Sequence, residues 1–368
     1  MRLRTWLVGL VVVALLATAA ALGVAGVVAS RDGWLQGLRD LSFGGSDEFR
    51  QNGPAFHESY TVRAPLTVDV QIDDGDVRIA RGGVMATVVV TPTARSSSAE
   101  GAAAAVASIQ PMITYDGGVL TVAWHGDANP RPRRADGRGV VVVITIPPSV
   151  TTTLSVQTRS GDVAVNGVRG SVTAATAFGD LNLVDLAGAV KATTSGGDIV
   201  ASGIEAGDAA VDLHTEFGDM RLGAIHAASI NAETSGGNIS AIDTTATGVG
   251  GIVVRTQFGD VELSGTSGDP TTVATDGGNV RVTARALPGA LTATSKFGDV
   301  DVTLPHGAGA EASVLTRFGS LIAPFVQGNV EDRDHSKPQT GRIGAGGPRV
   351  TLETDGGDAR LFVAPATR

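Results

Sequence analysis

A glycine recurs at an interval of about 20 residues through most of the chain, and the residues around it repeat with it. Nine copies are centred on Gly161, Gly179, Gly197, Gly218, Gly237, Gly259, Gly278, Gly298 and Gly319, and a tenth is centred on Gly357. The following residue is Asp or Asn in nine of the ten copies and Ser320 in the other. Self-similarity at a fixed period of this length is typical of solenoids, in which one structural unit stacks on the next.

Apolar and polar side chains alternate on both sides of each glycine. The residues two and four positions after it are apolar in every copy, as in Val163 and Val165. Those five and seven positions before it are apolar except at Thr271, and the residue between them is polar except at Val253. A period of two indicates strands with one buried face. The Gly-Asp or Gly-Asn pair predicts a turn, since Gly and Asn tolerate positive φ and Asp caps its own backbone.

Each unit therefore consists of a strand, a turn, a second strand and a variable return loop. Four inward apolar side chains cannot offset the entropy lost on ordering a whole unit, so stacked units must share their core and their hydrogen bonds. We predict an all-β fold, a parallel β-solenoid (β-helix) of about ten coils, right-handed by the crossover rule. We expect a less regular β cap before it and a transmembrane helix at the N-terminus.

Two further columns of the repeat allow more than one interpretation. A hydroxyl residue, Thr or Ser, stands three positions before every glycine, and we interpret it as a ladder of hydroxyls bonded to one another between coils rather than as a recognition surface. Immediately before the glycine stand Ser160, Phe178, Gly196, Phe217, Gly236, Phe258, Gly277, Phe297, then Phe318 and Gly356. A Phe can cover the bare glycine backbone of the next coil. The alternative is an exposed strip that stacks on sugars or peptides.

Residues 5–29 carry no charge. A helix of 25 residues is about 37 Å long, enough to cross a hydrocarbon core of roughly 30 Å. Because Arg2 and Arg4 precede the segment, the positive-inside rule places the repeats outside the cytoplasm. We predict a single-pass cell-membrane protein that contacts the membrane through residues 5–29 and has an extracytoplasmic C-terminal domain. The alternative is a cleaved signal peptide, whose apolar region is ordinarily only about 7–15 residues long.

Composition sets the expected boundaries. Residues 1–30 are the anchor or signal peptide, residues 31–56 a juxtamembrane linker, and residues 57–150 an irregular β region that caps the solenoid and contains an early copy of the turn at Gly75. Residues 151–324 carry the regular repeats, residues 325–347 form a polar surface loop, and residues 348–368 form the closing coil and C-terminus. Because Gly357 lies 38 residues after Gly319, nearly two periods, the loop replaces a coil.

The repeated T-x-[FSG]-G-[DN]-Φ-x-Φ pattern, preceded by the Val-x-Ile-x-Ile-Pro strand from Val142 to Pro147, resembles the bacterial "putative adhesin" domain family of unknown function. The resemblance covers about residues 60–365. It implies an extracytoplasmic β-solenoid in the cell envelope. The family defines no catalytic residues that could be carried over to this chain.

No catalytic or cofactor site is evident from the residues. The chain has no Cys, and none of its six His is spaced as a metal pair, so we expect no enzyme, no cofactor and no metal ligand. The Asp column beginning at Asp162 would be the calcium candidate. Calcium-binding β-rolls use two acidic motifs per coil, whereas this column supplies one acid per coil and is interrupted by Asn and Ser. We interpret these as turn residues, and calcium remains the open alternative.

The catalytic alternative is a carbohydrate-active β-helix enzyme with acids clustered on one exposed sheet. Asp212, Glu233, Arg255 and Lys191 lie at outward positions of neighbouring coils, and we interpret them as a solvated polar face. Without Arg2 and Arg4, 26 basic residues face 37 acidic ones, a net charge of −11 that disfavours nucleic acid as a partner. The basic segment 130–138 is a local exception, interpreted as a solvated loop, with lipid headgroups or anionic polymer as the alternative ligand.

Together these observations favour a non-catalytic extracytoplasmic envelope protein, whose solenoid acts as a scaffold or an adhesin-like binding surface for envelope polymer or a surface protein. A self-assembling solenoid filament is the alternative, followed by the carbohydrate-active enzyme. The residues do not identify a ligand, a ligand-binding site or an oligomeric state.

Overall fold

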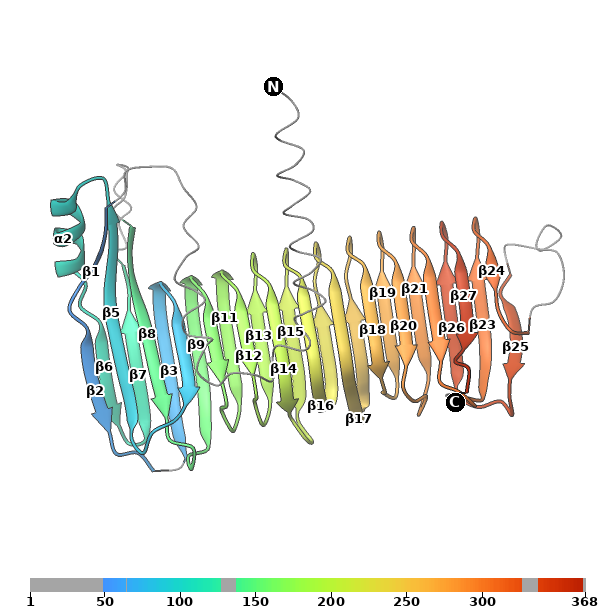
Figure 1. Ribbon diagram of the computed structural model, residues 1–368, viewed down its shortest axis with the longest axis horizontal. Coiled ribbons are helices and arrows are strands. Elements are labelled where there is room, and N and C mark those ends of the chain that lie inside the picture. Colours follow the sequence, from blue (N-terminus) through green and yellow to red (C-terminus); the bar gives the residue numbers. More distant parts are fainter. Residues whose placement is uncertain (1–48, 64, 127–136, 326–336, 367–368) are drawn as a thin grey trace, which may run out of the picture. The chain divides into compact units, whose positions relative to one another are not determined.

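The computed structural model describes residues 49–63, 65–126, 137–325 and 337–366, all within one compact unit (Figure 1). Most of these residues lie in strands, with a single helix among them, α2 (Ala99–Ala107). The all-β prediction is therefore confirmed, and the strands follow one another in a solenoid-like stack.

The strands fall into three groups along the chain. The first comprises β1 (Phe49–Asn52), β2 (Phe56–Tyr60), β3 (Leu66–Asp74), β4 (Val77–Arg81), β5 (Ala86–Ser96), β6 (Met112–Asp116), β7 (Val119–Trp124) and β8 (Gly137–Ile146). The second comprises β9 (Thr152–Ser160), β10 (Val163–Asn166), β11 (Val172–Phe178), β12 (Leu181–Val184), β13 (Val190–Thr194), β14 (Ile199–Glu205), β15 (Ala210–Thr215), β16 (Met220–Glu233), β17 (Ile239–Arg255), β18 (Val261–Thr266), β19 (Thr271–Thr275), β20 (Val280–Ala284), β21 (Leu291–Ser295), β22 (Val300–Leu304), β23 (Ala310–Thr316) and β24 (Leu321–Ile322). The third comprises β25 (Gln339–Ile343), β26 (Arg349–Thr354) and β27 (Ala359–Val363).

Equivalent strands of successive copies pair in parallel and in register. Before the glycine, β11 pairs with β9 on one side and β13 on the other, with Val172 opposite both Leu154 and Val190. After the glycine, β12 pairs with β10 and β14 in the same way. The long strands β16 and β17 contribute one segment to each ladder. Each copy therefore supplies one rung to each of two parallel ladders.

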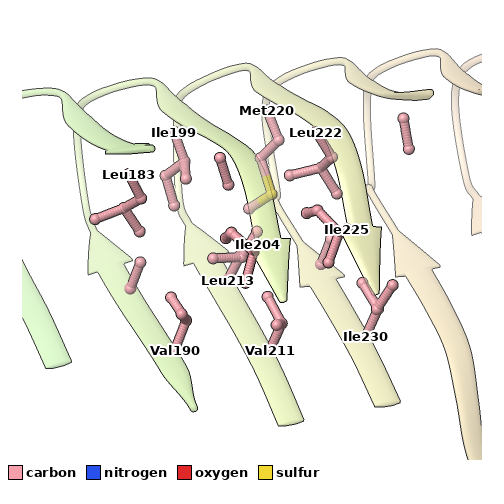
Figure 2. Close-up of a cluster of buried hydrophobic side chains, with 14 of the residues drawn as sticks. Leu183, Val190, Ile199, Ile204, Val211, Leu213, Met220, Leu222, Ile225 and Ile230 are labelled. Carbon is pink, nitrogen blue, oxygen red and sulfur yellow. The ribbon is translucent and has the colours of Figure 1, made fainter. Parts of the chain in front are cut away.

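The core lies between the two ladders. Figure 2 shows Leu183, Ile199 and Met220 of one ladder pointing into the same interior as Val190, Val211 and Leu213 of the other. These side chains are buried, and the alternation read from the sequence gives the inward positions correctly. Thr271, the polar exception in this alternation, is also buried, and its Oγ1 donates a hydrogen bond of 3.2 Å to the Gly268 carbonyl oxygen. This bond offsets the desolvation of the hydroxyl.

A second corner follows the second strand in six successive copies. Its residue, six positions after the central glycine, has a left-handed φ of 50–71° in each case: Gly167, Asp185, Gly203, Ala224, Asp243 and Gly265. The next residue is buried each time: Val168, Leu186, Ile204, Ile225, Thr244 and Thr266. The segment expected to be a variable return loop thus contributes a further inward column, visible at Ile204 and Ile225 in Figure 2.

The last copy in the sequence does not stand last in the stack. β26 pairs in parallel with β21 on one side and β23 on the other. β27 likewise pairs with β22 on one side and β24 on the other. The copy centred on Gly357 is therefore inserted between those centred on Gly298 and Gly319. Within the segment 325–347, expected to be a polar loop, β25 forms and pairs antiparallel with β23.

The other end of the stack has mixed pairing. β8 pairs in parallel with β4 and antiparallel with β5, which in turn pairs antiparallel with β1 and β2. β7 pairs in parallel with β3 and forms an antiparallel hairpin with β6. The helix α2 contacts β5 and β1, and its N-cap Ser98 accepts a 3.0 Å hydrogen bond from the Gly101 N–H.

The predicted cell-membrane localisation through a single-pass helix is wrong for the part of the chain that the structure describes. No helix there is long and apolar enough to cross a membrane. The helix α2 has nine residues, about 14 Å, against a hydrocarbon core of roughly 30 Å. The apolar segment 5–29, on which the prediction rested, lies outside the described residues.

Candidate binding surface

The central glycine of each copy is needed because neighbouring coils lie in close contact there, and not because of its backbone φ. A Cβ atom on any of these residues from Gly179 onward would lie 1.9–2.3 Å from the carbonyl oxygen of the equivalent glycine in the neighbouring coil. Of the ten central glycines, all within the described residues, only Gly161 has a positive φ, 131°. The expected reason for the glycine is therefore corrected: it lets one turn lie directly on another.

The hydroxyl column ties these turns together. Each hydroxyl from Thr176 onward donates to the glycine carbonyl of the neighbouring coil, at 2.7–3.1 Å. Thr256, for example, donates to Gly237 and accepts from the Gly259 N–H of its own coil. The column is buried. It is a structural ladder, as expected, but the hydroxyls bond to glycine backbone rather than to one another.

The Asp and Asn column forms a second ladder between side chain and backbone. In each coil the Oδ1 atom accepts the N–H of the equivalent residue in the next coil, at 2.7–3.2 Å, from Asp76 to the end of the stack. An Asn Oδ1 accepts as a carboxylate does, so Asn238 and Asn279 continue the ladder. Ser320 stands in the last parallel coil, where no later N–H needs an acceptor. The apparent interruptions are thus explained by the ladder.

Arginines compensate part of the negative charge in this column. Arg360 contacts Asp299 and Asp301, both at 3.1 Å, as well as Asp358. The hydrogen bond from the Ser320 N–H is the main cause that lowers the pKa of Asp358, and Arg360 adds to it. Among the described residues, no group of three or more His, Asp or Glu side chains is arranged to hold a metal ion.

Replacing Asp260 tests the ladder. We expect Asp260→Ala to lower the free energy of unfolding by about 0.5–1.5 kcal/mol, because the Asn279 N–H, now 2.7 Å from Oδ1, loses its acceptor. Asp260→Asn keeps that oxygen and should change stability by less than about 0.5 kcal/mol. Urea unfolding measures the free energy of unfolding of both variants, and repeating it with calcium tests whether the column binds the ion. A calcium-dependent midpoint for the wild type, lost in Asp260→Asn, would contradict the ladder interpretation.

The alternating Phe residues form an exposed row, here called the Phe strip: Phe178, Phe217, Phe258, Phe297 and Phe318. Their exposed fractions are 66, 74, 75, 74 and 85%. The first four rings also contact the glycine of the next coil, where Cδ1 lies 3.2–3.6 Å from the position of a Cβ on Gly196, Gly236, Gly277 or Gly356. The ring therefore covers glycine backbone, as expected, and still leaves most of its surface in solvent.

The order of the stack makes the strip regular. In sequence the alternation breaks, because Phe297 is followed by Phe318 and only then by Gly356. In space Gly356 lies between them, since β26 is flanked by β21 and β23. Phe and glycine thus alternate from Phe178 to Phe318. With neighbouring strands about 4.8 Å apart, successive rings recur at about 9.6 Å.

Residues 143–226 and 217–361 match the family model described as Toastrack DUF4097. The chain belongs to this family. The predicted resemblance to a "putative adhesin" domain family is confirmed. No curated protein matches the chain.

The solved structures similar to this Toastrack chain include the following three, all of low identity. One is a putative cell adhesion protein from Clostridium sporogenes, with 9% identity over 84% of this chain and 100% of that one, and a TM-score of 0.19. The second is a putative adhesin from Bacteroides fragilis, with 12% identity, coverage of 84% and 97%, and a TM-score of 0.31. The third is a putative adhesin from Parabacteroides distasonis, with 12% identity, coverage of 85% and 98%, and a TM-score of 0.28.

Polar rows flank the Phe strip of this Toastrack domain. The Asp and Asn ladder follows it on one side. On the other, the residues directly before each Phe or its glycine counterpart are mostly polar: Ser195, Glu216, Ser235, Gln257, Asp276, Lys296, Asp355 and Arg317. Lys296 pairs with Asp276 at 2.8 Å, and Arg317 pairs with Asp355. A molecule lying on the rings would therefore meet hydrogen-bonding groups along both edges.

The outward acids considered for catalysis lie on the ladder that precedes the turn. Asp212 stands in register with Lys191 and Asn231, and Glu233 with His214 and Arg255. The Glu233 carboxylate accepts a hydrogen bond of 3.0 Å from Arg255. The structure brings these residues onto one exposed sheet of neighbouring coils, as expected. Pro130 to Arg134 of the basic segment lie outside the described residues.

Proposed function

We propose that this Toastrack chain is a non-catalytic protein, a parallel β-solenoid of about ten coils that acts as a rigid scaffold for an adhesin-like binding surface. The Phe strip is that surface. The observation that carries the proposal is the regular exposure of five Phe rings, each between 66 and 85% accessible.

Packing alone does not account for rings this exposed. Burial of apolar area stabilises a fold in proportion to the area removed from water, and most of each ring stays in water. A regular row of exposed apolar rings with polar edges is typical of an interaction site. The row is also held in place, because the turn beneath it is fixed by the hydroxyl and Asp ladders. Binding to a pre-organised row costs little ordering entropy.

Two further features favour a lateral surface over the alternatives. Antiparallel strands occur at both ends of the stack, β6 on β7 and β25 on β23, which weighs against end-to-end addition of further parallel coils. On the sheet considered for catalysis, Glu233 is paired with Arg255, an arrangement typical of a solvated ion pair.

Adsorption of the purified full chain to bacterial cell-wall fragments and to protein-coated beads tests the proposal. We expect saturable binding to one of these surfaces, weakened at least about fivefold in the double variant Phe217→Ser, Phe258→Ser, if each ring contributes about 0.5–1.5 kcal/mol. Phe362→Ser is the matched control, because Phe362 is 42% exposed but lies outside the strip. Equal adsorption of all three proteins, or no saturable adsorption by the wild type, would overturn the proposal.

A further inference from the structure

We propose that the Phe strip binds an extended polysaccharide of β-1,4-linked pyranose sugars running along the stack, with one sugar face on each ring. This inference rests on the proposed function and names the ligand class of the same surface. It is drawn from the spacing of the rings, the gaps between them and the polar rows beside them.

The spacing favours this polymer. The rings recur at about 9.6 Å, twice the separation of neighbouring strands. In an extended β-1,4-linked chain, successive sugars are turned over relative to each other, so the same face returns once per disaccharide. That repeat is close to the ring spacing. The intervening sugar would lie between successive rings, because the coils between them contribute only Gly196, Gly236, Gly277 or Gly356 and no further ring. The Phe and glycine alternation thus matches the alternation of the sugar faces.

The surroundings also suit a glycan. Pyranose rings present axial C–H groups on their faces and hydroxyls on their edges, so they need an apolar platform between polar rows. Asp162 and Asp260 use one carboxylate oxygen, Oδ1, for the next coil and leave Oδ2 to accept from a hydroxyl. Arginine pairs with Oδ2 of Asp198, Asp219, Asp299 and Asp358. On the opposite edge, Gln257 and Lys296 directly precede Phe258 and Phe297 and are exposed. Charged and amide groups on both edges provide donors and acceptors.

An extended peptide fits this spacing less well. A β-strand returns a side chain to the same face every two residues, about 6.6–6.8 Å, which does not match the ring interval. A polyproline II helix repeats at about 9.3 Å, close to the ring interval. Proline-rich segments, however, dock in grooves lined by aromatic side chains, whereas this row lies on a turn and its rings are more than half exposed. A proline-rich peptide and a second copy of the chain are outcomes that the experiment distinguishes.

The experiment titrates the full chain with cello- and chito-oligosaccharides of two to twelve sugars. We expect affinity to rise with each added disaccharide and to level off near ten sugars, because five rings address five repeats. The double variant Phe217→Leu, Phe258→Leu keeps apolar surface but removes two rings, and should bind at least about fivefold more weakly. Phe258→Trp should retain binding. Phe362→Leu, outside the strip, should match the wild type.

Several results would overturn the inference. If the leucine variant binds as tightly as the wild type, ring stacking is not the basis of recognition. If no β-1,4-linked oligomer binds while Phe-dependent adsorption to cell walls or protein persists, the ligand class is wrong and the proposed function stands. Binding of a polyproline peptide alone, or concentration-dependent dimers lost in the leucine variant, would identify the other occupants. Failure of Phe-dependent adsorption to any surface would remove both the inference and the proposed function.

Discussion

Gly218→Ala is expected to prevent the middle coils from folding, with a loss of more than about 4 kcal/mol of stability. The added Cβ would lie 1.9 Å from the Gly197 carbonyl oxygen and 2.5 Å from its carbonyl carbon. Both are backbone atoms, and a Cβ added to Gly197 would lie equally close to the Gly179 carbonyl oxygen. No flexible side chain can move aside, so the coils must separate and break the hydroxyl and Asp ladders.

Gly223→Ala, in the same coil, is the matched control. Its added Cβ would meet only the Ser202 Cβ, at 3.9 Å, an ordinary van der Waals distance. We expect unchanged stability or a gain of about 0.4–1 kcal/mol from the less flexible unfolded chain. Thermal unfolding followed by circular dichroism measures both variants. Similar losses in the two would show that glycine is needed for backbone freedom and not for close stacking.

Val254→Asp should have the second largest effect. Val254 is fully buried and stands in register between Ala232 and Val273, so an aspartate there would face only apolar side chains of the shared core. A buried carboxyl without a partner loses its hydration, and we expect a destabilisation of at least about 4 kcal/mol, with loss of the middle coils.

Thr173→Asp places the same side chain on the outward column of the same ladder. Thr173 is exposed, and substitutions at exposed positions away from caps and ion pairs change stability by about 0.5 kcal/mol. Urea denaturation of the two variants compares them directly. Equal losses would mean that the inward and outward columns are assigned incorrectly.

The sequence predicts the features that the physics of one coil determines. The period of two identifies buried residues such as Val254 because every second side chain of a strand faces the same way. The fixed period predicts parallel stacking, since only equivalent positions can share a core. The residues Thr256 and Asp260 are also predicted to be structural, although the sequence does not reveal that both bond to the backbone of a neighbouring coil.

Three other features were not predicted. The left-handed corner at Asp185 and Ala224 is hidden because only some copies use glycine there. The insertion of the Gly357 copy depends on the strands with which it pairs. The alternation of apolar and polar residues within one copy does not determine those partners. Two signals did exist: the broken alternation at Phe318, and Ser320 in place of Asp. Exposure of the Phe rings could not be read from sequence, because a covering role and an exposed role require the same residue.

Disulfide formation between engineered cysteines tests the central claim most directly: that equivalent strands stack in parallel register in an order that makes the Phe strip continuous. The chain contains no native Cys. Thr351 stands opposite both Thr292 and Ser313 in adjacent strands. Disulfides join Cα atoms about 4.4–6.8 Å apart, whereas Thr292 and Ser313, separated by β26, are about 9.6 Å apart.

We predict that Thr292→Cys with Thr351→Cys, and Ser313→Cys with Thr351→Cys, each form an intramolecular disulfide on mild oxidation, and that Thr292→Cys with Ser313→Cys does not. Mass spectrometry of the oxidised, proteolysed chain identifies the linked peptides. A disulfide between positions 292 and 313, with none to position 351, would show that the copies stack in sequence order. It would contradict both the inserted coil and the continuous Phe strip.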